Sequence, residues 1–269
     1  MPAILWTSDL HLDHTGVVVR DALLQSIREC PGDVFIVAGD TSVARNLVAD
    51  LEVLADAAAR PTYFVLGNHD HYGGGVSPVR DAVLALGERR PHIQWLPPAG
   101  VVTLSPETAL VGVDGWADGR LGDPLTTRYV LNDDRFIGEL ATLDSRRARL
   151  VVKRALADAD AERLRVLIGR AIAFARTIVI ATHIPPFPEA LPKTGRLSDP
   201  DWLPLVVCGA TGSVIRTIAA EHPDRDFVVL CGHTHVAMDV HIGANLRCIV
   251  NGARYGEPRV RTLELSSRA

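Results

Sequence analysis

Short polar segments rich in His and Asp follow apolar runs at several places along the chain. They are Ser8-Asp9-Leu10-His11, Gly39-Asp40, Gly67-Asn68-His69-Asp70, Thr182-His183 and Gly232-His233-Thr234-His235. These segments supply aspartate, asparagine and histidine side chains that can bind metal, and one further histidine that can transfer protons. Such a set of side chains fits a hydrolytic site that holds two metal ions.

The types of these side chains indicate which metals the site would take. The expected ligands are Asp9, His11, Asp40, Asn68, His183, His233 and His235. Carboxylate, imidazole and amide oxygen suit divalent ions such as Mn²⁺, Fe²⁺ and Zn²⁺, whereas the lack of thiolates in the set disfavours a structural zinc site. A carboxylate such as Asp40 can bridge two ions about 3.5–4 Å apart, and such a pair can activate water for in-line attack on a phosphate ester.

His69 is not an obvious ligand, because its neighbour Asn68 can coordinate a metal through the amide oxygen. His69 could instead protonate a leaving alkoxide or orient the phosphate. Asp70 follows directly, and we expect its carboxylate to hold the imidazole in position, as carboxylate–histidine pairs do. We therefore predict that His69 and Asp70 are the catalytic residues.

Apolar, β-branched runs predict the strands that position these segments. The predicted strands are Ile4–Thr7, Asp33–Ala38, Thr62–Leu66, Ile93–Leu96, Val101–Leu104, Ala109–Val113, Thr177–Ala181 and Asp226–Leu230. Metal-binding segments follow several strands directly, and the carboxyl ends of neighbouring strands form the crevice where α/β sheets bind ligands. Strand–helix alternation, followed by an antiparallel pattern over His241–Leu265, predicts an α/β core with mixed sheets.

Helical spacing of apolar residues predicts helices between these strands. The predicted helices are Val17–Arg28, Val43–Ala59, Val79–Gly87 and Ala210–Glu221. A further helical pattern covers about 136–176, after an irregular insertion at about 115–135 that is rich in Gly, Asp and Arg. Residues 184–204 carry six prolines and are predicted to form a long loop. We expect residues 1–269 to form a single domain in which these two loops are candidates for substrate selection.

The two loops carry side chains with two alternative roles. The arginines could bind a second phosphate or a nucleotide, or could pair with nearby aspartates on the surface. The arginines are Arg120, Arg128 and Arg135, and the aspartates are Asp118, Asp123, Asp133 and Asp134. The aromatic residues Trp116, Tyr129 and Trp202 could stack on a base or pack within the protein.

The remaining histidines are interpreted as non-ligands. His14 and His71 lie near the motifs and could line the site, but each is interpreted as a loop residue. Asp13 could support the site or simply occupy a surface turn. The other three, which we expect to be structural or solvent-facing, are His92, His222 and His241.

Composition limits the classes of function. The chain of 269 residues is 47% apolar with a net charge of −4 and no basic run, so nucleic acid is an unlikely partner. The four cysteines show no metal-binding spacing and are expected to be buried free thiols, which favours a reducing cytoplasm. We see neither a signal peptide nor a membrane span, and no pattern that sets the oligomeric state.

The ordered segments resemble the motifs of the calcineurin-like metallophosphoesterase superfamily. Its pattern is D-x-H, G-D, G-N-H-[DE], H and G-H-x-H, and every part occurs between Asp9 and His235. The resemblance implies a sandwich of two mixed β-sheets flanked by helices in four layers. It also implies two metal ions with a bridging hydroxide, and His69 as the general acid or phosphate-orienting group. The implied ligands are Asp9, His11, Asp40 and His235 for the first ion, and Asp40, Asn68, His183 and His233 for the second.

Departures from the pattern narrow the function. Phosphoprotein phosphatases continue the second motif as G-D-x-V-D-R-G, whereas this chain continues from Gly39 to Arg45 without the second Asp and Gly, which disfavours that branch. The nuclease branch usually has an extra DNA-facing domain, for which we see no room after His235. We predict a phosphatase or phosphodiesterase in which the hydroxide attacks a small-molecule or nucleotide phosphate ester in line. A nuclease of the same superfamily and a non-catalytic scaffold are the alternatives.

Overall fold

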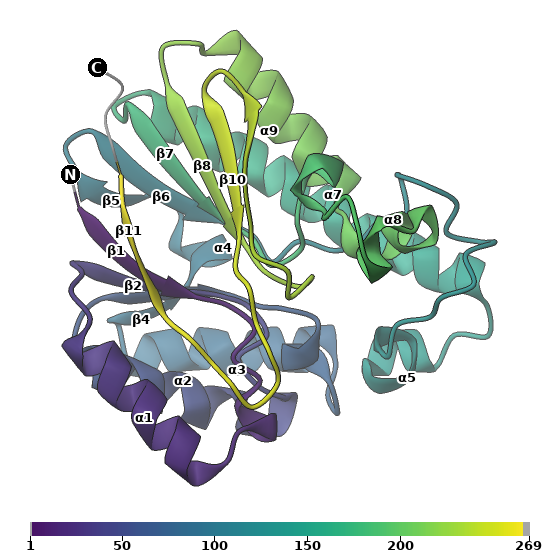
Figure 1. The fold of residues 1–269 in the computed structure, drawn as a ribbon, viewed down its shortest axis with the longest axis horizontal. Helices are drawn as coiled ribbons and strands as arrows, with labels where there is room; N and C mark the ends of the chain where they lie inside the picture. Colours follow the sequence, from purple (N-terminus) through teal and green to yellow (C-terminus); the bar gives the residue numbers. More distant parts are fainter. Residues whose placement is uncertain (1, 266–269) are drawn as a thin grey trace.

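Two β-sheets packed face to face form the centre of the molecule in the computed structural model, which describes residues 2–265 (Figure 1). The first sheet has the strand order β11-β1-β2-β3-β4. Its strands are β1 (Ala3–Thr7), β2 (Val34–Ala38), β3 (Thr62–Val65), β4 (Ile93–Trp95) and β11 (Arg261–Glu264). Strands β1 to β4 are parallel, and β11 pairs antiparallel with β1.

The second sheet has the order β5-β6-β7-β8-β10-β9. Its strands are β5 (Val102–Ser105), β6 (Thr108–Gly112), β7 (Thr177–Ala181), β8 (Asp226–Cys231), β9 (Met238–Gly243) and β10 (Leu246–Val250). The four central strands are parallel, and β5 and β9 are antiparallel edges. Both sheets are therefore mixed, as the resemblance implied.

Helices cover the outer face of each sheet and complete four layers (Figure 1). Helices α1 (Val17–Glu29), α2 (Ala44–Ala58) and α3 (Val76–Arg89) lie on the first sheet. Helices α7 (Arg146–Ile172) and α9 (Gly209–Glu221) lie on the second. The short helices are α4 (Leu96–Ala99), α5 (Asp133–Phe136), α6 (Gly138–Ala141) and α8 (Leu203–Val206).

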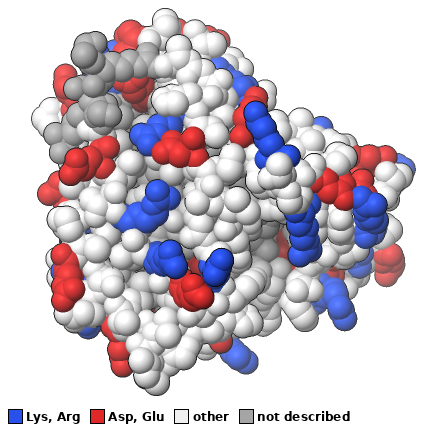
Figure 2. Space-filling view, viewed as in Figure 1, with Lys and Arg blue, Asp and Glu red and all other residues white. Residues whose placement is uncertain are grey.

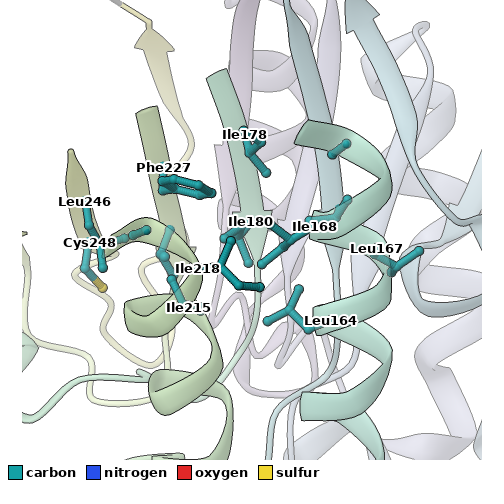
Figure 3. Packing of buried hydrophobic residues seen from close by; sticks show 14 of the residues in the cluster. Leu164, Leu167, Ile168, Ile178, Ile180, Ile215, Ile218, Phe227, Leu246 and Cys248 are labelled. Atoms are coloured by element: carbon teal, nitrogen blue, oxygen red, sulfur yellow. The ribbon is translucent and has the colours of Figure 1, made fainter. Parts of the chain in front are cut away.

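Burial of apolar side chains holds the layers together. Trp6 and Ile36 from the first sheet and Val179 and Leu230 from the second are fully or almost fully buried between the sheets. On the other side of the second sheet, leucine and isoleucine side chains of α7 and α9 pack on β7, β8 and β10 (Figure 3). Burial of such a side chain contributes about 1.5–3 kcal/mol, so the strand ends are fixed on a rigid base.

Most predicted elements agree with the structure to within a few residues at each end, but the helical pattern at 136–176 is interrupted. Short helices α5 and α6 precede a break, and the long helix α7 begins only after Ser145. The Ser145 hydroxyl caps this helix by accepting a hydrogen bond from the Ala148 N–H at 3.1 Å. The stretch from Gly115 to Asn132 contains no helix or strand, as predicted.

The pattern at His241–Leu265 was predicted as antiparallel strands, and the structure divides it between the two sheets. Strand β9 pairs antiparallel with β10, but β10 also pairs in parallel with β8. Strand β11 crosses to the first sheet and pairs with β1. The chain between β10 and β11 therefore passes over the edge where the strands of both sheets end.

The described residues also test two compositional expectations. Cys208, Cys231 and Cys248 are buried free thiols, whereas Cys30 at the end of α1 is only partly buried. Among these residues no single helix has the length and apolar character needed to span a membrane. One pair of helical segments, Pro200–Val206 and Gly209–Glu221, has that length and apolar character only when the two are taken together, and the chain bends by 80° between them.

Candidate metal centre

The backbone conformation marks the residues that follow the strands. Asp9, His11, Asp40, His233 and His235 all have positive φ, between 42° and 69°. This left-handed region is unusual for residues other than glycine and costs of order 1–3 kcal/mol each, although Asp and His tolerate it better than most. Five strained residues at one edge of a sandwich indicate a functional site there.

The first group of predicted ligands meets beside β1. Donor atoms of Asp9, His11 and His235 lie within 4.8 Å of one another. The His11 and His235 Nε2 atoms are 3.0 Å apart, and His235 Nε2 is 3.4 Å from Asp9 Oδ1. His11 and Asp9 are buried, and His235 is partly exposed. Two imidazole nitrogens and a carboxylate that point at one another can share one cation.

The second group lies beside the first and includes Asp40. Asp40, His183 and His233 also have donor atoms within 4.8 Å of one another. Asn68 completes this group, since its Oδ1 is 3.2 Å from His183 Nε2 and 3.1 Å from His233 Nδ1. Asp40 Oδ2 lies 3.3 Å from His183 Nε2 and 3.8 Å from His11 Nε2, so this carboxylate stands between the two groups.

Glycines beside the ligands leave room for this convergence. A Cβ atom at Gly67 would lie 2.1 Å from Asp40 Oδ1, and one at Gly232 would lie 2.1 Å from Asp9 Oδ2. Gly39 has φ +84° and would place a Cβ 2.6 Å from His183 Nδ1. Any side chain at these positions would displace a predicted ligand, so their role goes beyond turning the chain.

Protonation in the centre suits cation binding. Burial opposes charge on the imidazoles of His11 and His233 and lowers the pKa of each to about 4. Burial also opposes charge on His183, but the adjacent Asp40 carboxylate outweighs it and raises the pKa of His183 to about 10. Burial alone would raise the pKa of Asp40, and His183 instead holds it well below its usual range. At neutral pH the centre thus combines an ionised Asp40 with neutral imidazoles at His11 and His233, the forms that bind metal, whereas His183 would release its proton when a metal binds.

Asp70 contacts the backbone rather than His69. Its two carboxylate oxygens accept hydrogen bonds from the N–H groups of Asp40, Thr41, Ser42 and Gly67 at 2.8–3.0 Å. No hydrogen bond in residues 2–265 joins its carboxylate to the imidazole of His69. The prediction that Asp70 holds the imidazole is therefore wrong. This fully buried carboxylate instead ties the loop after β2 to the loop after β3.

Tyr72 takes the position beside His69 that was predicted for Asp70. The two rings stack with centroids 4.2 Å apart and an angle of 28°. The His69 ring also meets the His11 ring edge-on at 4.6 Å, and a His69 ring nitrogen lies within 4.8 Å of donor atoms of His11 and Asp40. His69 is therefore next to the ligand groups and partly open to solvent.

Asp133 orients Asn68 and was not singled out from the sequence as a site residue. Its Oδ1 accepts hydrogen bonds from Asn68 Nδ2 at 2.7 Å and from the Tyr72 hydroxyl at 2.6 Å. With its amide nitrogen engaged in this way, Asn68 turns its oxygen toward His183 and His233. Asp133 is buried and lies near Lys153, whose Nζ is 4.0 Å away. Its place at the end of an irregular stretch gave no local pattern by which to recognise it.

Tyr255, on the segment between β10 and β11, was also missed. Its ring lies 4.4 Å from that of His11 and 5.2 Å from that of His235, and the residue is 51% exposed. An exposed aromatic ring over predicted ligands is a feature of the assembled site. The sequence around it shows no motif.

The loop arginines mostly form ion pairs. Arg120 pairs with Asp118 at 2.8 Å and with Asp158 at 2.7 Å. Arg128 pairs with residues of the other loop, Asp199 and Asp201, rather than with its neighbours in sequence. Arg135 is exposed and has no ion pair within the described part of the chain.

The loop aromatics and remaining histidines lie mainly in packing or at the surface. Trp202 stacks on Tyr129 at 4.1 Å, and buried Trp116 lies 5.3 Å from the ring of His71. His71 is fully buried, whereas His14 is exposed beside Tyr255 and Asp13. The three others are at least partly exposed and lie outside the ligand groups: His92, His222 and His241.

Comparison with known proteins assigns the chain to a family. A family model described as calcineurin-like phosphoesterase matches residues 2–237. Among curated proteins, no sequence matches the chain.

Solved structures of similar fold cover nearly the whole chain. Phosphopantetheinyl hydrolase (PptH) from Mycobacterium tuberculosis has a TM-score of 0.64 at 15% identity, over 97% of this chain and 95% of that chain. A dimetal phosphatase from Danio rerio has a TM-score of 0.57 at 13% identity, over 93% and 87%. The protein TT1561 of Thermus thermophilus has a TM-score of 0.57 at 14% identity, over 97% of both chains. At these identities the likeness is one of fold.

Proposed function

Because the chain belongs to the calcineurin-like phosphoesterase family, it is a phosphoester hydrolase, and we propose that it works with two divalent metal ions. The observation that carries this proposal is the position of the Asp40 carboxylate between two ligand groups, 3.3 Å from His183 Nε2 and 3.8 Å from His11 Nε2. The first ion would be held by Asp9, His11, Asp40 and His235, and the second by Asp40, Asn68, His183 and His233.

The donor set fits such ions. It consists of carboxylates, imidazoles and one amide oxygen, which suit Mn²⁺, iron or Zn²⁺. When bound, the ions supply a nucleophilic water of lowered pKa and neutralise the charge on the phosphoryl oxygens. His233 donates its backbone N–H to Asp9 Oδ1 at 2.8 Å, so the ligands also brace one another.

His69 is the residue that we propose assists the leaving group. Its ring borders a pocket of about 680 Å³ that is also lined by Arg45, His14, Tyr72 and Tyr255. An imidazole that is held by stacking and faces such a pocket can give a proton to a departing alkoxide or hold a phosphoryl oxygen. Asp70 would act only through the backbone turn, as a positioning residue.

The substrate that we propose is a small-molecule or nucleotide phosphate ester. Relatives of this fold include proteins named as a phosphatase and as a phosphopantetheinyl hydrolase, so both monoesters and diesters are open. We further propose one domain for the whole chain, since buried residues of both sheets share a core. The free cysteines support a reducing compartment such as the cytoplasm.

The test is metal-dependent hydrolysis of generic substrates. Metal-stripped protein receives Mn²⁺, Fe²⁺, Zn²⁺, Ni²⁺ or Mg²⁺ separately, and turnover of p-nitrophenyl phosphate and bis-p-nitrophenyl phosphate is measured. We expect turnover to return with at least one metal, and the ratio of the two rates to reveal monoester or diester preference. Protein that takes up no metal and hydrolyses neither ester would contradict the proposal.

Substitutions separate ligands from the proton donor. Asp40→Ala and His235→Ala should abolish metal-dependent turnover and lower the bound metal. His69→Ala should lower kcat by about 10²–10⁴-fold while the metal content stays near two ions per chain. Loss of the metals from the His69 variant would show that His69 is a ligand instead.

A further inference from the structure

A second pocket beside the ligand groups is strongly basic. It has a volume of about 630 Å³ and is lined by His235, Arg254, Arg259 and Arg261, with no acidic residue in its lining. His235 is one of the proposed metal ligands, so the pocket opens directly beside the metal centre. Three arginines in one pocket contrast with a chain whose net charge is −4.

The arginines belong to a segment that the family model does not cover. The match ends at residue 237, whereas the pocket takes Arg254 and Arg259 from the connection between β10 and β11, and Arg261 from the start of β11. This connection crosses the strand ends of both sheets (Figure 1). Figure 2 shows several Lys and Arg side chains near the middle of this face, with Asp or Glu side chains beside some of them. The basic pocket is therefore a property of this chain beyond the shared motifs.

The charges of these arginines are largely unneutralised within the described part of the chain. Arg254 is exposed, and its side chain has neither a hydrogen bond nor an ion pair there. Arg259 faces Glu257 at 3.6 Å in a pair that is 73% and 52% exposed, which makes it a weak pair. Arg261 lies over the Trp6 ring at 5.9 Å without a hydrogen bond or ion pair within residues 2–265, although Asp239, which pairs with Arg247, lies near enough to attract it. An incoming anion would replace little existing interaction.

We propose that this pocket binds a second phosphate group of the substrate while the scissile ester occupies the metal centre. The inference rests on the proposed function, because it assumes that the ester binds beside His235. Guanidinium groups match phosphate oxygens in pairs of parallel hydrogen bonds, and several around one pocket favour a doubly charged group over a carboxylate. The substrate class is accordingly a phosphoester that carries another phosphate, as nucleoside bisphosphates do.

A compact ligand fits better than a nucleic acid. The arginines gather in one concave pocket of a chain that is acidic overall, whereas a nucleic-acid surface needs positive charge along an extended track. Tyr255 lies close to both pockets, because its ring is 5.2 Å from that of His235 in the basic pocket and 6.3 Å from that of His69 in the other. A ligand that reaches from one pocket to the other would extend past the side chains of Tyr255, His235 and His69.

The test compares two inhibitors that differ by one phosphate. Inhibition constants for adenosine 5′-monophosphate and adenosine 3′,5′-bisphosphate are measured against bis-p-nitrophenyl phosphate hydrolysis. Calorimetric titration of the metal-loaded protein gives the two dissociation constants independently of turnover. We expect the bisphosphate to bind at least about tenfold tighter, as one added charge-assisted contact would give. The Arg254→Gln and Arg259→Gln variants should each reduce this preference severalfold, and together should abolish it.

The readout is the ratio of the dissociation constants of the monophosphate and the bisphosphate. A general loss of activity or of folded protein affects both constants equally and leaves their ratio unchanged. Arg165→Gln serves as the matched control, since Arg165 is an exposed arginine of α7 that pairs with Glu162. A wild-type ratio near one, or a ratio unchanged in the double variant, would overturn the inference.

Two further outcomes separate the possible failures. If a short oligothymidylate inhibits through the arginines and the bisphosphate does not, the pocket contacts nucleic acid and the inference is wrong. If the protein binds the bisphosphate through Arg254 and Arg259 but hydrolyses no ester with any metal, the proposed function fails and the phosphate pocket stands.

Discussion

At the scale of residues, two neighbours in the chain have opposite surroundings. The His69 ring lies against Tyr72 and the pocket beside the metal centre, whereas the Asp70 carboxylate is buried and accepts backbone hydrogen bonds. A local sequence pattern treats them as a catalytic pair. The structure divides them into a residue that can reach substrate and one that shapes the turn.

Asp70→Asn should therefore destabilise the protein rather than remove a catalytic group. An amide offers one acceptor oxygen to N–H donors that the carboxylate satisfies with two. We expect a loss of about 2–4 kcal/mol in the free energy of unfolding, measured by urea denaturation of the metal-free protein. His69→Ala is the comparison, and it should leave that free energy nearly unchanged. Equal stability of the two variants would contradict the assignment.

Asp133→Ala should weaken the second metal site without touching a ligand. Without the carboxylate, the Asn68 amide is free to rotate away, and loss of such an orienting contact typically costs 10–100-fold in metal affinity. Metal titration followed by elemental analysis would measure this. Asp144→Ala is the control, because Asp144 is exposed at the surface before α7. If both variants bind two ions with wild-type affinity, Asp133 has no role in orienting Asn68.

At the scale of elements, glycines show how closely the strand ends approach. Gly232→Ala should disrupt the first ligand group, because the new Cβ would lie 2.1 Å from Asp9 Oδ2 and 2.4 Å from Ser8 Oγ. We expect loss of at least one bound ion. Gly169→Ala in α7 is the matched substitution, since no atom lies within 4 Å of a Cβ there. It should raise the free energy of unfolding by about 0.5–1 kcal/mol and leave metal binding intact.

Helix α7 also carries a buried carboxylate that makes stability depend on pH. Burial and the charge of Asp114 raise the pKa of Asp160 to about 7, although its oxygen accepts a hydrogen bond from the Gly115 N–H. A raised pKa in the folded state means that stability is greatest below the unfolded value of about 4 and declines as the pH rises through 7. The slope is at most about 1.4 kcal/mol per pH unit for one group.

The asparagine in the Asp160→Asn variant cannot ionise, so the free energy of unfolding of this variant should decline less steeply as the pH rises. Urea unfolding at pH 5.5 and pH 8 would compare the change in the free energy of unfolding between variant and wild type. An identical change in both would show that Asp160 is not the group responsible.

At the scale of the whole molecule, the proposed metal centre would join the two sheets and should stabilise their association. Asp9, Asp40 and Asn68 follow strands of the first sheet, whereas His183 and His233 follow strands of the second. Ions that bind only the folded protein at a hundredfold excess over Kd add about 2.7 kcal/mol each. Chelation should therefore lower Tm by about 5 °C or more, measured by scanning calorimetry. The Tm of the Asp40→Ala variant should not change when metal is added or removed. A wild-type Tm that is unchanged by chelation would contradict two-ion binding.

The sequence by itself determined the elements and the identities of the predicted ligands. Apolar periodicity is a local property, so strands such as Thr177–Ala181 could be located from it, as could the ligands that follow strand ends. The ordered motifs also predicted a sandwich of two β-sheets. The family match and the observed sheet topology agree with this prediction. These features depend on residues close together in the chain.

Only the tertiary structure decided which side chains support the ligands and what lies beside them. Asp133 reaches Asn68 across 65 positions of sequence, and the segment with Tyr255 and Arg254 returns to the site after the last motif. Asp70 was misassigned because its partners are backbone groups of a loop some thirty positions earlier. Contacts between distant segments arise from packing of the two sheets, and packing leaves no periodic signal in the chain.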